Sequence, residues 1–273
     1  MINGSECGEN KQKEDAMRLE NKVALVTGAG SGMGQASAVM FAKEGAAVTV
    51  VDLNQETGQE TVDMINQEGG ESIFLKADVG NTGDAEAMIN KTIERFGKLD
   101  ILMNNAGIAQ SMTPIEEVEE AVWDKIFDVN VKAIYLACRY AVPIMKKQGG
   151  GVIINTASVI GVRPRPKLCA YLASKGAAIT LTKGLAIELA SFNIRVNCLN
   201  PVATDTPMFP FFIDASGARD ANFEEAKKKF IETVPMGRMA TSEDIAKAAL
   251  FLASDDSAFI TGVGIEVDGG RAI

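Results

Sequence analysis

The sequence predicts an α/β fold of the doubly wound type, in which helices cover both faces of a parallel sheet of about seven strands. Two observations predict it: short apolar runs alternate with helical patterns, and a glycine-rich turn joins the first run to the first helix. The 273 residues have an apolar content of 47%, which is sufficient for one large core. Because no linker or repeat divides the sequence, we expect a single domain over residues 20–273 after a polar tail over residues 1–19.

Each strand is predicted by a short apolar run between turn residues. The runs lie at residues 23–26, 47–51, 73–75, 99–103, 152–154, 194–199 and 264–267. Helical patterns alternate with them, in which apolar residues recur at steps of three and four. These helices are expected over residues 33–41, 55–68, 88–96, 123–149, 177–189 and 241–251.

Glycine and capping residues indicate where several of these helices begin and end. Gly45 ends the first helix and Gly69 the second, as C-terminal caps do. Thr241 and Asp244 form a capping pair at the start of the last helix. The helix that ends at residue 149 is largely apolar, so its surface must be covered, either within the chain or by another subunit.

Composition excludes several classes of function. The formal net charge of −9 argues against nucleic acid or an anionic membrane as a partner. No apolar run is long enough to span a bilayer, and no signal segment is visible, which predicts a cytoplasmic protein with reduced cysteines. The chain contains no histidine, so serine–histidine and cysteine–histidine mechanisms and histidine-ligated metals are excluded. We expect no metal site.

The glycine-rich turn predicts a dinucleotide site. It has the pattern T-G-x-x-x-G-x-G on Thr27, Gly28, Gly32 and Gly34. Glycine has no Cβ, so it accepts positive φ and lets the backbone approach a ligand closely. The N–H groups at the start of the following helix can bind a phosphate.

Further motifs follow this turn in a fixed order. The fourth strand ends in N-N-A-G at residues 104–107, and Tyr171 and Lys175 form Y-x-x-x-K, a spacing that places both side chains on one helix face. Ser158 lies thirteen residues before Tyr171, and Asn130 lies in the long apolar helix. With these motifs, residues 22–270 resemble the short-chain dehydrogenase/reductase (SDR) family, which has a Rossmann-like fold.

The resemblance implies hydride transfer between a nicotinamide cofactor and a secondary alcohol or ketone. Tyr171 would be the general base in oxidation and the general acid in reduction, and Ser158 would hold the substrate oxygen. Lys175 would hold the nicotinamide ribose and lower the tyrosine pKa, and Asn130 would hold a water for proton relay. An ammonium ~4 Å from a phenol is worth about 4 kcal/mol at an effective dielectric of ~20, which would lower a pKa of about 10 by roughly three units.

The expected cofactor is NAD. Asp52 ends the second strand fewer than twenty residues beyond Gly34, where a carboxylate can accept hydrogen bonds from the adenosine ribose and repel a 2′-phosphate. Ser31 and Leu53 provide no basic side chain for such a phosphate. The residues expected to bind the cofactor, several of them only by the resemblance, are Gly28, Ser31, Gly32, Met33, Gly34, Asp52, Leu53, Asp78, Val79, Asn105, Ala106, Gly107, Tyr171, Lys175, Pro201, Thr204 and Thr206. Val202 departs from the family, which often has glycine there.

Residues 206–239 correspond to the substrate lid of the family, and they contain five phenylalanines. These side chains are consistent with an apolar pocket for a small, largely apolar or cyclic substrate, and equally with packing of the lid on the body. Arg163, Arg165 and Lys167 indicate either an anionic substrate group or an exposed loop.

The resemblance also implies that the protein is a homo-oligomer, either a tetramer or a dimer. Three hypotheses about its function remain open. The leading hypothesis is an NAD-dependent alcohol dehydrogenase or ketone reductase. An NADP-linked 3-oxoacyl-carrier-protein reductase would prefer NADPH, which Asp52 disfavours. A non-catalytic dinucleotide sensor would bind cofactor without turnover, which the complete set of Asn130, Ser158, Tyr171 and Lys175 argues against.

Overall fold

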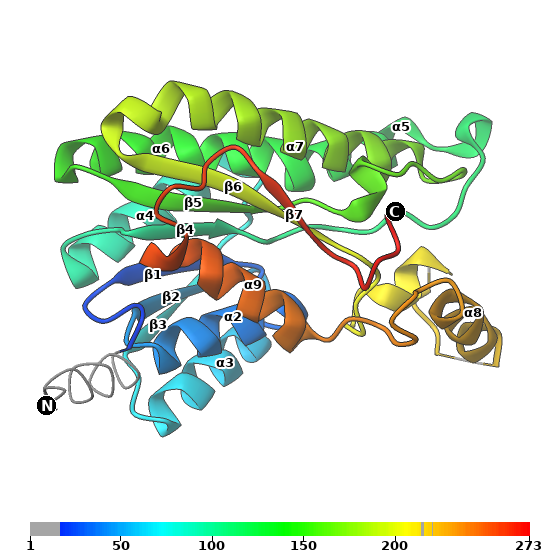
Figure 1. Ribbon diagram of the computed structural model, residues 1–273, viewed down its shortest axis with the longest axis horizontal. Coiled ribbons are helices and arrows are strands. Elements are labelled where there is room, and N and C mark those ends of the chain that lie inside the picture. The colour runs from blue at the N-terminus through cyan, green and yellow to red at the C-terminus, as the bar shows by residue number, and fades with distance from the viewer. Residues whose placement is uncertain (1–16, 214–215, 220) are drawn as a thin grey trace, which may run out of the picture.

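The predicted architecture is confirmed by the computed structural model, which describes residues 17–213, 216–219 and 221–273 (Figure 1). A seven-stranded parallel sheet has the strand order β3-β2-β1-β4-β5-β6-β7. The strands are β1 (Val23–Thr27), β2 (Ala47–Asp52), β3 (Ser72–Lys76), β4 (Ile101–Asn104), β5 (Gly151–Thr156), β6 (Ile194–Pro201) and β7 (Gly264–Val267). The helices are α2 (Gly32–Lys43), α3 (Gln55–Gln67), α4 (Thr82–Phe96), α5 (Glu120–Phe127), α6 (Ala133–Gln148), α7 (Cys169–Leu189), α8 (Ala221–Ile231) and α9 (Ser242–Ala253).

The order of the strands reverses beside β1, and this fixes where a ligand can bind. All five residues of β1 are buried, and β1 pairs with β2 on one side and with β4 on the other. The chain therefore leaves the sheet in opposite directions after β1 and β4, which opens a crevice between the turns at their carboxyl ends.

Helices lie on both faces of the sheet, and each face has its own apolar core beneath them (Figure 1). Helices α2, α3 and α9 cover one face, where Phe41 and Leu250 are buried. Helices α4, α6 and α7 cover the other, where Met88 and Leu189 are buried. In the described part of the chain, no helix combines the length and the apolar character that crossing a membrane requires.

The predicted tail is too long at its boundary with the domain. Residues 1–16 lie outside the described residues, but Leu19 is fully buried and its N–H donates to the Glu44 carbonyl at 2.8 Å. The domain therefore begins before residue 20. No local sequence pattern predicts the hydrogen bond between Leu19 and Glu44, because the two residues are far apart in the sequence.

The predicted long helix over residues 123–149 is divided in the structure. Between α5 and α6 the chain forms a π-helical segment, Asp128–Lys132, which contains Asn130. Such segments occur frequently at functional sites, because the wider turn redirects the side chains that follow. The predicted helix over residues 177–189 begins eight residues earlier, at Cys169, so Tyr171 and Lys175 lie on one helix as expected. Its first turns contain buried polar residues, including Ser174 and Lys175, which conceal the apolar period.

One face of α6 is buried within the chain, against α4 and the sheet, and includes Ala133, Leu136 and Ala141. Trp123 on α5 and Tyr135 on α6 remain 38% and 50% exposed. The homo-oligomer stays a prediction.

Candidate active site

The glycine turn between β1 and α2 has the geometry of an anion site. Gly28 and Gly32 have φ values of +61° and +56°, the left-handed region that side chains disfavour. A Cβ on Gly28 would lie 2.8 Å from the Ala106 Cα, so this turn approaches the end of β4 closely. Ser31 is the N-cap of α2 but makes no capping hydrogen bond through its side chain, which leaves the N–H groups of the first turn available to a phosphate.

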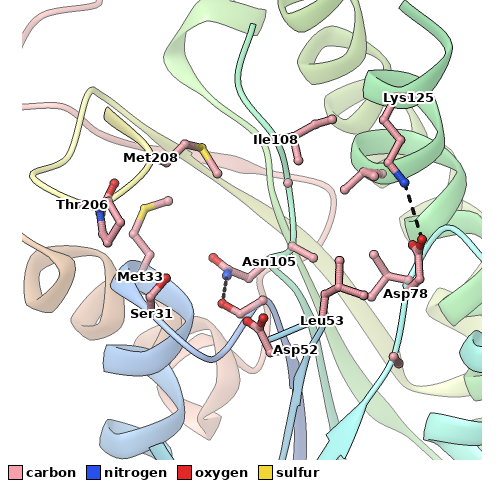
Figure 2. Close-up of a pocket in the computed structure, with 18 residues that line it drawn as sticks. Ser31, Met33, Asp52, Leu53, Asp78, Asn105, Ile108, Lys125, Thr206 and Met208 are labelled. Atoms are coloured by element: carbon pink, nitrogen blue, oxygen red, sulfur yellow. Dashed lines mark hydrogen bonds and ion pairs between the residues drawn. The ribbon is translucent and has the colours of Figure 1, made fainter. Parts of the chain in front are cut away.

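A cavity of about 260 Å³ opens at this turn, at the carboxyl ends of β1 and β4 (Figure 2). Figure 2 shows Asp52 and Leu53 near the turn, with Thr206 and Met208 at the left and Lys125 at the right. Most of the predicted cofactor residues line it: Gly28, Ser31, Gly32, Met33, Asp52, Leu53, Asp78, Val79, Asn105, Ala106, Gly107 and Thr206. The sequence did not predict the remaining lining residues: Ala77, Ile108, Lys125, Val129, Pro207 and Met208.

Hydrogen bonds hold the N-N-A-G turn against the end of β1. The Thr27 hydroxyl accepts from the N–H groups of Asn105 and Ala106 at 3.0 and 3.1 Å. The Asn105 amide donates to the carbonyls of Thr27 and Gly28 at 3.0 and 3.2 Å. These bonds give the two strand ends that flank the crevice a fixed separation.

The Asp52 carboxylate lies in this cavity with its position fixed by the backbone. It accepts from Gly30 N–H at 2.8 Å and from Asn54 N–H at 2.9 Å. Among the described residues that line this cavity, Lys125 is the one basic side chain, and it pairs with Asp78 at 3.5 Å. The cavity therefore presents the Asp52 carboxylate, and none of the described residues that line it is an unpaired cation.

A second cavity, of about 620 Å³, adjoins the first. Met33, Asn105, Gly107, Thr206 and Met208 line both cavities. Of the predicted site residues, the second cavity adds Ser158, Tyr171, Lys175, Pro201 and Thr204. A dinucleotide in the first cavity would therefore extend toward Tyr171 across these shared residues.

Ser158, Tyr171 and Lys175 meet at the wall of the second cavity. Ser158 follows β5, its hydroxyl donates to the Pro201 carbonyl at 3.3 Å, and it hydrogen-bonds to the Tyr171 side chain. Lys175 lies one helical turn after Tyr171, and its Nζ is 5.6 Å from the centre of the tyrosine ring. The ammonium donates to the Thr156 carbonyl at 2.8 Å.

The prediction that Lys175 lowers the pKa of Tyr171 is wrong for the chain without bound cofactor. Burial raises the pKa of Tyr171 to about 12. Burial also lowers the pKa of Lys175 to about 8. Removing both groups from water disfavours their charged forms more than the lysine charge favours the phenolate. At neutral pH the Tyr171 hydroxyl is therefore protonated, the form that donates a proton.

The buried lysine makes stability depend on pH. Its pKa is about 8 in the folded chain, below the ordinary value of 10.5, so above pH 8 the folded state loses a proton that the unfolded state keeps. Stability should rise with pH in this window, by about 2 kcal/mol between pH 8 and pH ~9.5. We expect denaturant unfolding of the wild type to show this rise relative to Lys175→Met. Parallel pH profiles of the two proteins would contradict it.

Asn130 lines neither cavity, and its side-chain oxygen and nitrogen are hydrogen-bonded to other residues of the chain. Its carbonyl oxygen accepts from Ile108 N–H at 2.8 Å, and its amide donates to the Ile108 carbonyl and the Ser174 hydroxyl at 3.2 and 3.1 Å. Both amide hydrogens are used, so this side chain fixes the loop after β4 against α7. A relay water held at Asn130 stays a prediction.

Gly34 lines neither cavity, and its contact with cofactor stays a prediction. A Cβ at this position would collide with the Gly28 carbonyl oxygen, and it would lie 2.5 Å from the Asn105 amide nitrogen. Gly34 thus allows α2 to pack directly on the turn. Val202, where the family often has glycine, is buried and lines the second cavity.

Gln110 is a positioning residue that the sequence did not predict. It is 2% exposed, and its side-chain oxygen accepts from the Tyr171 N–H at 3.0 Å. This bond satisfies an N–H of the first turn of α7 and fixes where Tyr171 enters the cavity. The two residues are 61 positions apart, so no local motif connects them.

A doubly wound sheet with an anion-binding turn and an adjoining serine–tyrosine–lysine site defines a nucleotide-binding oxidoreductase. A family model described as enoyl-(acyl carrier protein) reductase matches residues 28–272. An uncharacterized oxidoreductase of Thermotoga maritima is 46% identical over 254 residues, which cover 93% of this chain and 98% of that protein. Cyclopentanol dehydrogenase of Comamonas sp. is 36% identical over 253 residues, which cover 93% of this chain and 98% of that protein.

The crystal structure of a 3-ketoacyl-(acyl-carrier-protein) reductase from Brucella melitensis, complexed with NADH, superposes on the chain with a TM-score of 0.86. The two are 42% identical in sequence, and the match covers 93% of this chain and all of the other. The chain belongs to the short-chain dehydrogenase/reductase family.

Proposed function

We propose that this protein is an NAD-dependent oxidoreductase that interconverts a secondary alcohol and a ketone. The observation that carries the proposal is the meeting of Ser158, Tyr171 and Lys175 at a cavity that adjoins the glycine turn. Their spacing and burial suit proton transfer to or from a substrate oxygen beside a nicotinamide. Cyclopentanol dehydrogenase among the relatives supports a secondary alcohol as substrate.

The residues of the first cavity fit a dinucleotide. The positive φ of Gly28 and Gly32 and the uncapped start of α2 would hold its phosphates, and Asp52 would accept from its adenosine ribose. When bound, the cofactor would give a hydride to the carbonyl carbon of a ketone or take one from the carbon of an alcohol.

Side chains of the protein would transfer the proton that accompanies the hydride. In reduction, the Tyr171 hydroxyl would donate its proton to the carbonyl oxygen that receives the charge, and the product would be a secondary alcohol. Ser158 would hold the same oxygen by a hydrogen bond. Lys175, whose Nζ lies 5.6 Å from the tyrosine ring centre, would stabilise the phenolate that remains until it is reprotonated.

The choice of NAD over NADP gives a test. We expect NADH to bind at least about tenfold more tightly than NADPH, because Asp52 repels a 2′-phosphate. Asp52→Ser should reduce that preference, as measured by NADH and NADPH fluorescence titration. The matched control is Asp63→Ser, an exposed carboxylate on α3 that lies outside the cavity. Equal affinity of the wild type for both cofactors would contradict this assignment.

The reaction is tested by incubating the protein with NADH and a panel of neutral cyclic and aliphatic ketones, and with NAD and the matching alcohols. Turnover of at least one pair supports the proposal. Preference for NADPH with 3-oxoacyl thioesters would favour the reductase alternative, which the Brucella melitensis structure keeps open. Cofactor binding without turnover of any ketone or alcohol, whether neutral or anionic, would favour a sensor.

A further inference from the structure

The second cavity has a charge balance opposite to that of the whole chain. The chain has a formal net charge of −9, yet the charged side chains that line this cavity are all basic: Arg163, Arg165, Lys175, Lys229 and Arg271. Within the described residues, none of its lining side chains is an aspartate or glutamate. Lys175 belongs to the catalytic set, and Lys229 pairs with Glu225 at 2.6 Å, which leaves the three arginines to be explained.

Arg271 is a buried cation without a carboxylate partner. It is only 6% exposed, and no ion pair between described residues includes it. Its Nε donates to the Thr233 hydroxyl at 2.8 Å, and its guanidinium lies 4.5 Å from the centre of the Phe230 ring. Its Nη2 is buried without a hydrogen-bond partner in the described structure. A buried charge in this state is unfavourable, and a nearby anion would stabilise it.

Arg163 and Arg165 bring two more positive charges to the same cavity. Both follow Ser158 within seven residues and lie in the exposed loop before α7. Arg163 donates to the backbone carbonyl of Arg271, so this loop is tied to the chain after β7. Arg165 forms no ion pair among the described side chains.

Aromatic contacts connect the tyrosine with the buried arginine. The Phe212 ring packs edge-on against Tyr171 with ring centres 4.9 Å apart, and Phe212 belongs to the same short helix as Phe209. Phe209 lies 5.9 Å from Phe230, which is the ring under Arg271. Aromatic rings therefore line the cavity wall between Tyr171 and Arg271.

We propose that the substrate of this site is an anionic ketone or alcohol, with an apolar body between the reacting carbon and an oxyanion such as a carboxylate. The oxyanion is held by the charge of buried Arg271, with Arg165 as an outer contact. This assignment depends on the proposed function, since it names the substrate class of the same site. It explains why an acidic protein gathers arginines at one cavity.

The test uses non-reacting probes on the enzyme with NADH bound. Cyclohexanecarboxylate should bind at least about tenfold more tightly than cyclohexanecarboxamide, because a hydrogen bond to a charged group contributes more than a neutral one. Arg271→Gln should remove most of this preference and Arg165→Gln a smaller part, whereas Arg271→Lys should retain it. The control for net charge is Lys91→Gln, an exposed lysine on α4 that lines neither cavity. If Arg271→Gln does not fold, the anion site is tested by the carboxylate preference of the other two variants, which should be retained in Arg271→Lys and reduced in Arg165→Gln.

Equal binding of the two probes to the wild type would overturn the anion site. A matched kinetic comparison, 4-oxocyclohexanecarboxylate against its amide, separates this failure from failure of the proposed function. Turnover of both ketones without preference for the carboxylate overturns the anion site alone. Binding preference for the carboxylate, with neither ketone nor any of the panel reduced, overturns the oxidoreductase function and with it the assignment of the anion as a substrate group.

Discussion

Tyr171→Phe should lower kcat by roughly 100- to 10,000-fold while NADH still binds. The substitution removes one hydroxyl and keeps the ring, so the edge-on contact with Phe212 at 4.9 Å is retained. The two polar side chains beside this hydroxyl already use a hydrogen elsewhere, because Ser158 donates to the Pro201 carbonyl and Lys175 donates to the Thr156 carbonyl. Turnover is measured with saturating NADH and the best ketone of the panel, and cofactor affinity by NADH fluorescence.

The matched control is Tyr140→Phe, which removes a hydroxyl from α6, away from both cavities. Its kcat should change by no more than about twofold, as is typical of substitutions outside a site. If Tyr171→Phe also kept its kcat, Tyr171 would not be the proton donor. A loss of NADH binding equal to the loss of turnover would instead show a structural defect.

The sequence predicted the fold well because each strand is a short apolar run and most helices have an apolar period of three to four residues. The run before Thr27 predicts β1, and the spacing of Tyr171 and Lys175 predicts that they share a face of α7. Strand ends of a parallel sheet meet at one edge, so motifs that follow β1, β4 and β5 are brought together by topology alone. This is why most of the predicted cofactor residues line one cavity.

Other features of the site come from contacts between distant segments. Gln110 contacts Tyr171 from the loop after β4, and Lys125 reaches Asp78 from α5. Arg271 is a candidate for binding an anion because it is buried, and no local sequence pattern near residue 271 predicts that burial. The π-helical segment around Asn130 likewise has no periodic signal, because it departs from the helical period by one residue.

The pKa values show a further limit of reasoning from spacing. Proximity of Lys175 predicts a lowered pKa for Tyr171, but burial raises the pKa to about 12. The spacing of the two residues predicts that the Lys175 charge lies near Tyr171. How far both side chains are removed from water depends on the packing around them, which the spacing does not predict.

Gly34→Ala should weaken NADH binding strongly and reduce kcat/KM by about 100-fold, although Gly34 lines neither cavity. The added methyl would collide with the Gly28 carbonyl oxygen and would lie 2.5 Å from the Asn105 amide nitrogen, which holds that carbonyl. The Gly28 obstacle is backbone, so the turn itself must shift. We expect a loss of stability of about 1–3 kcal/mol, which is typical of overpacking.

The matched control is Gly184→Ala on α7, where a Cβ would meet no atom within 4 Å. Alanine there should stabilise the protein by about 0.5–1 kcal/mol, because it replaces glycine in an open helical position. Thermal unfolding and NADH titration of the two variants compare the same chemical change at a crowded and at an open position. Unchanged NADH affinity in Gly34→Ala would show that the turn tolerates the displacement, and the close packing of α2 on Gly28 would then not be what shapes the phosphate site.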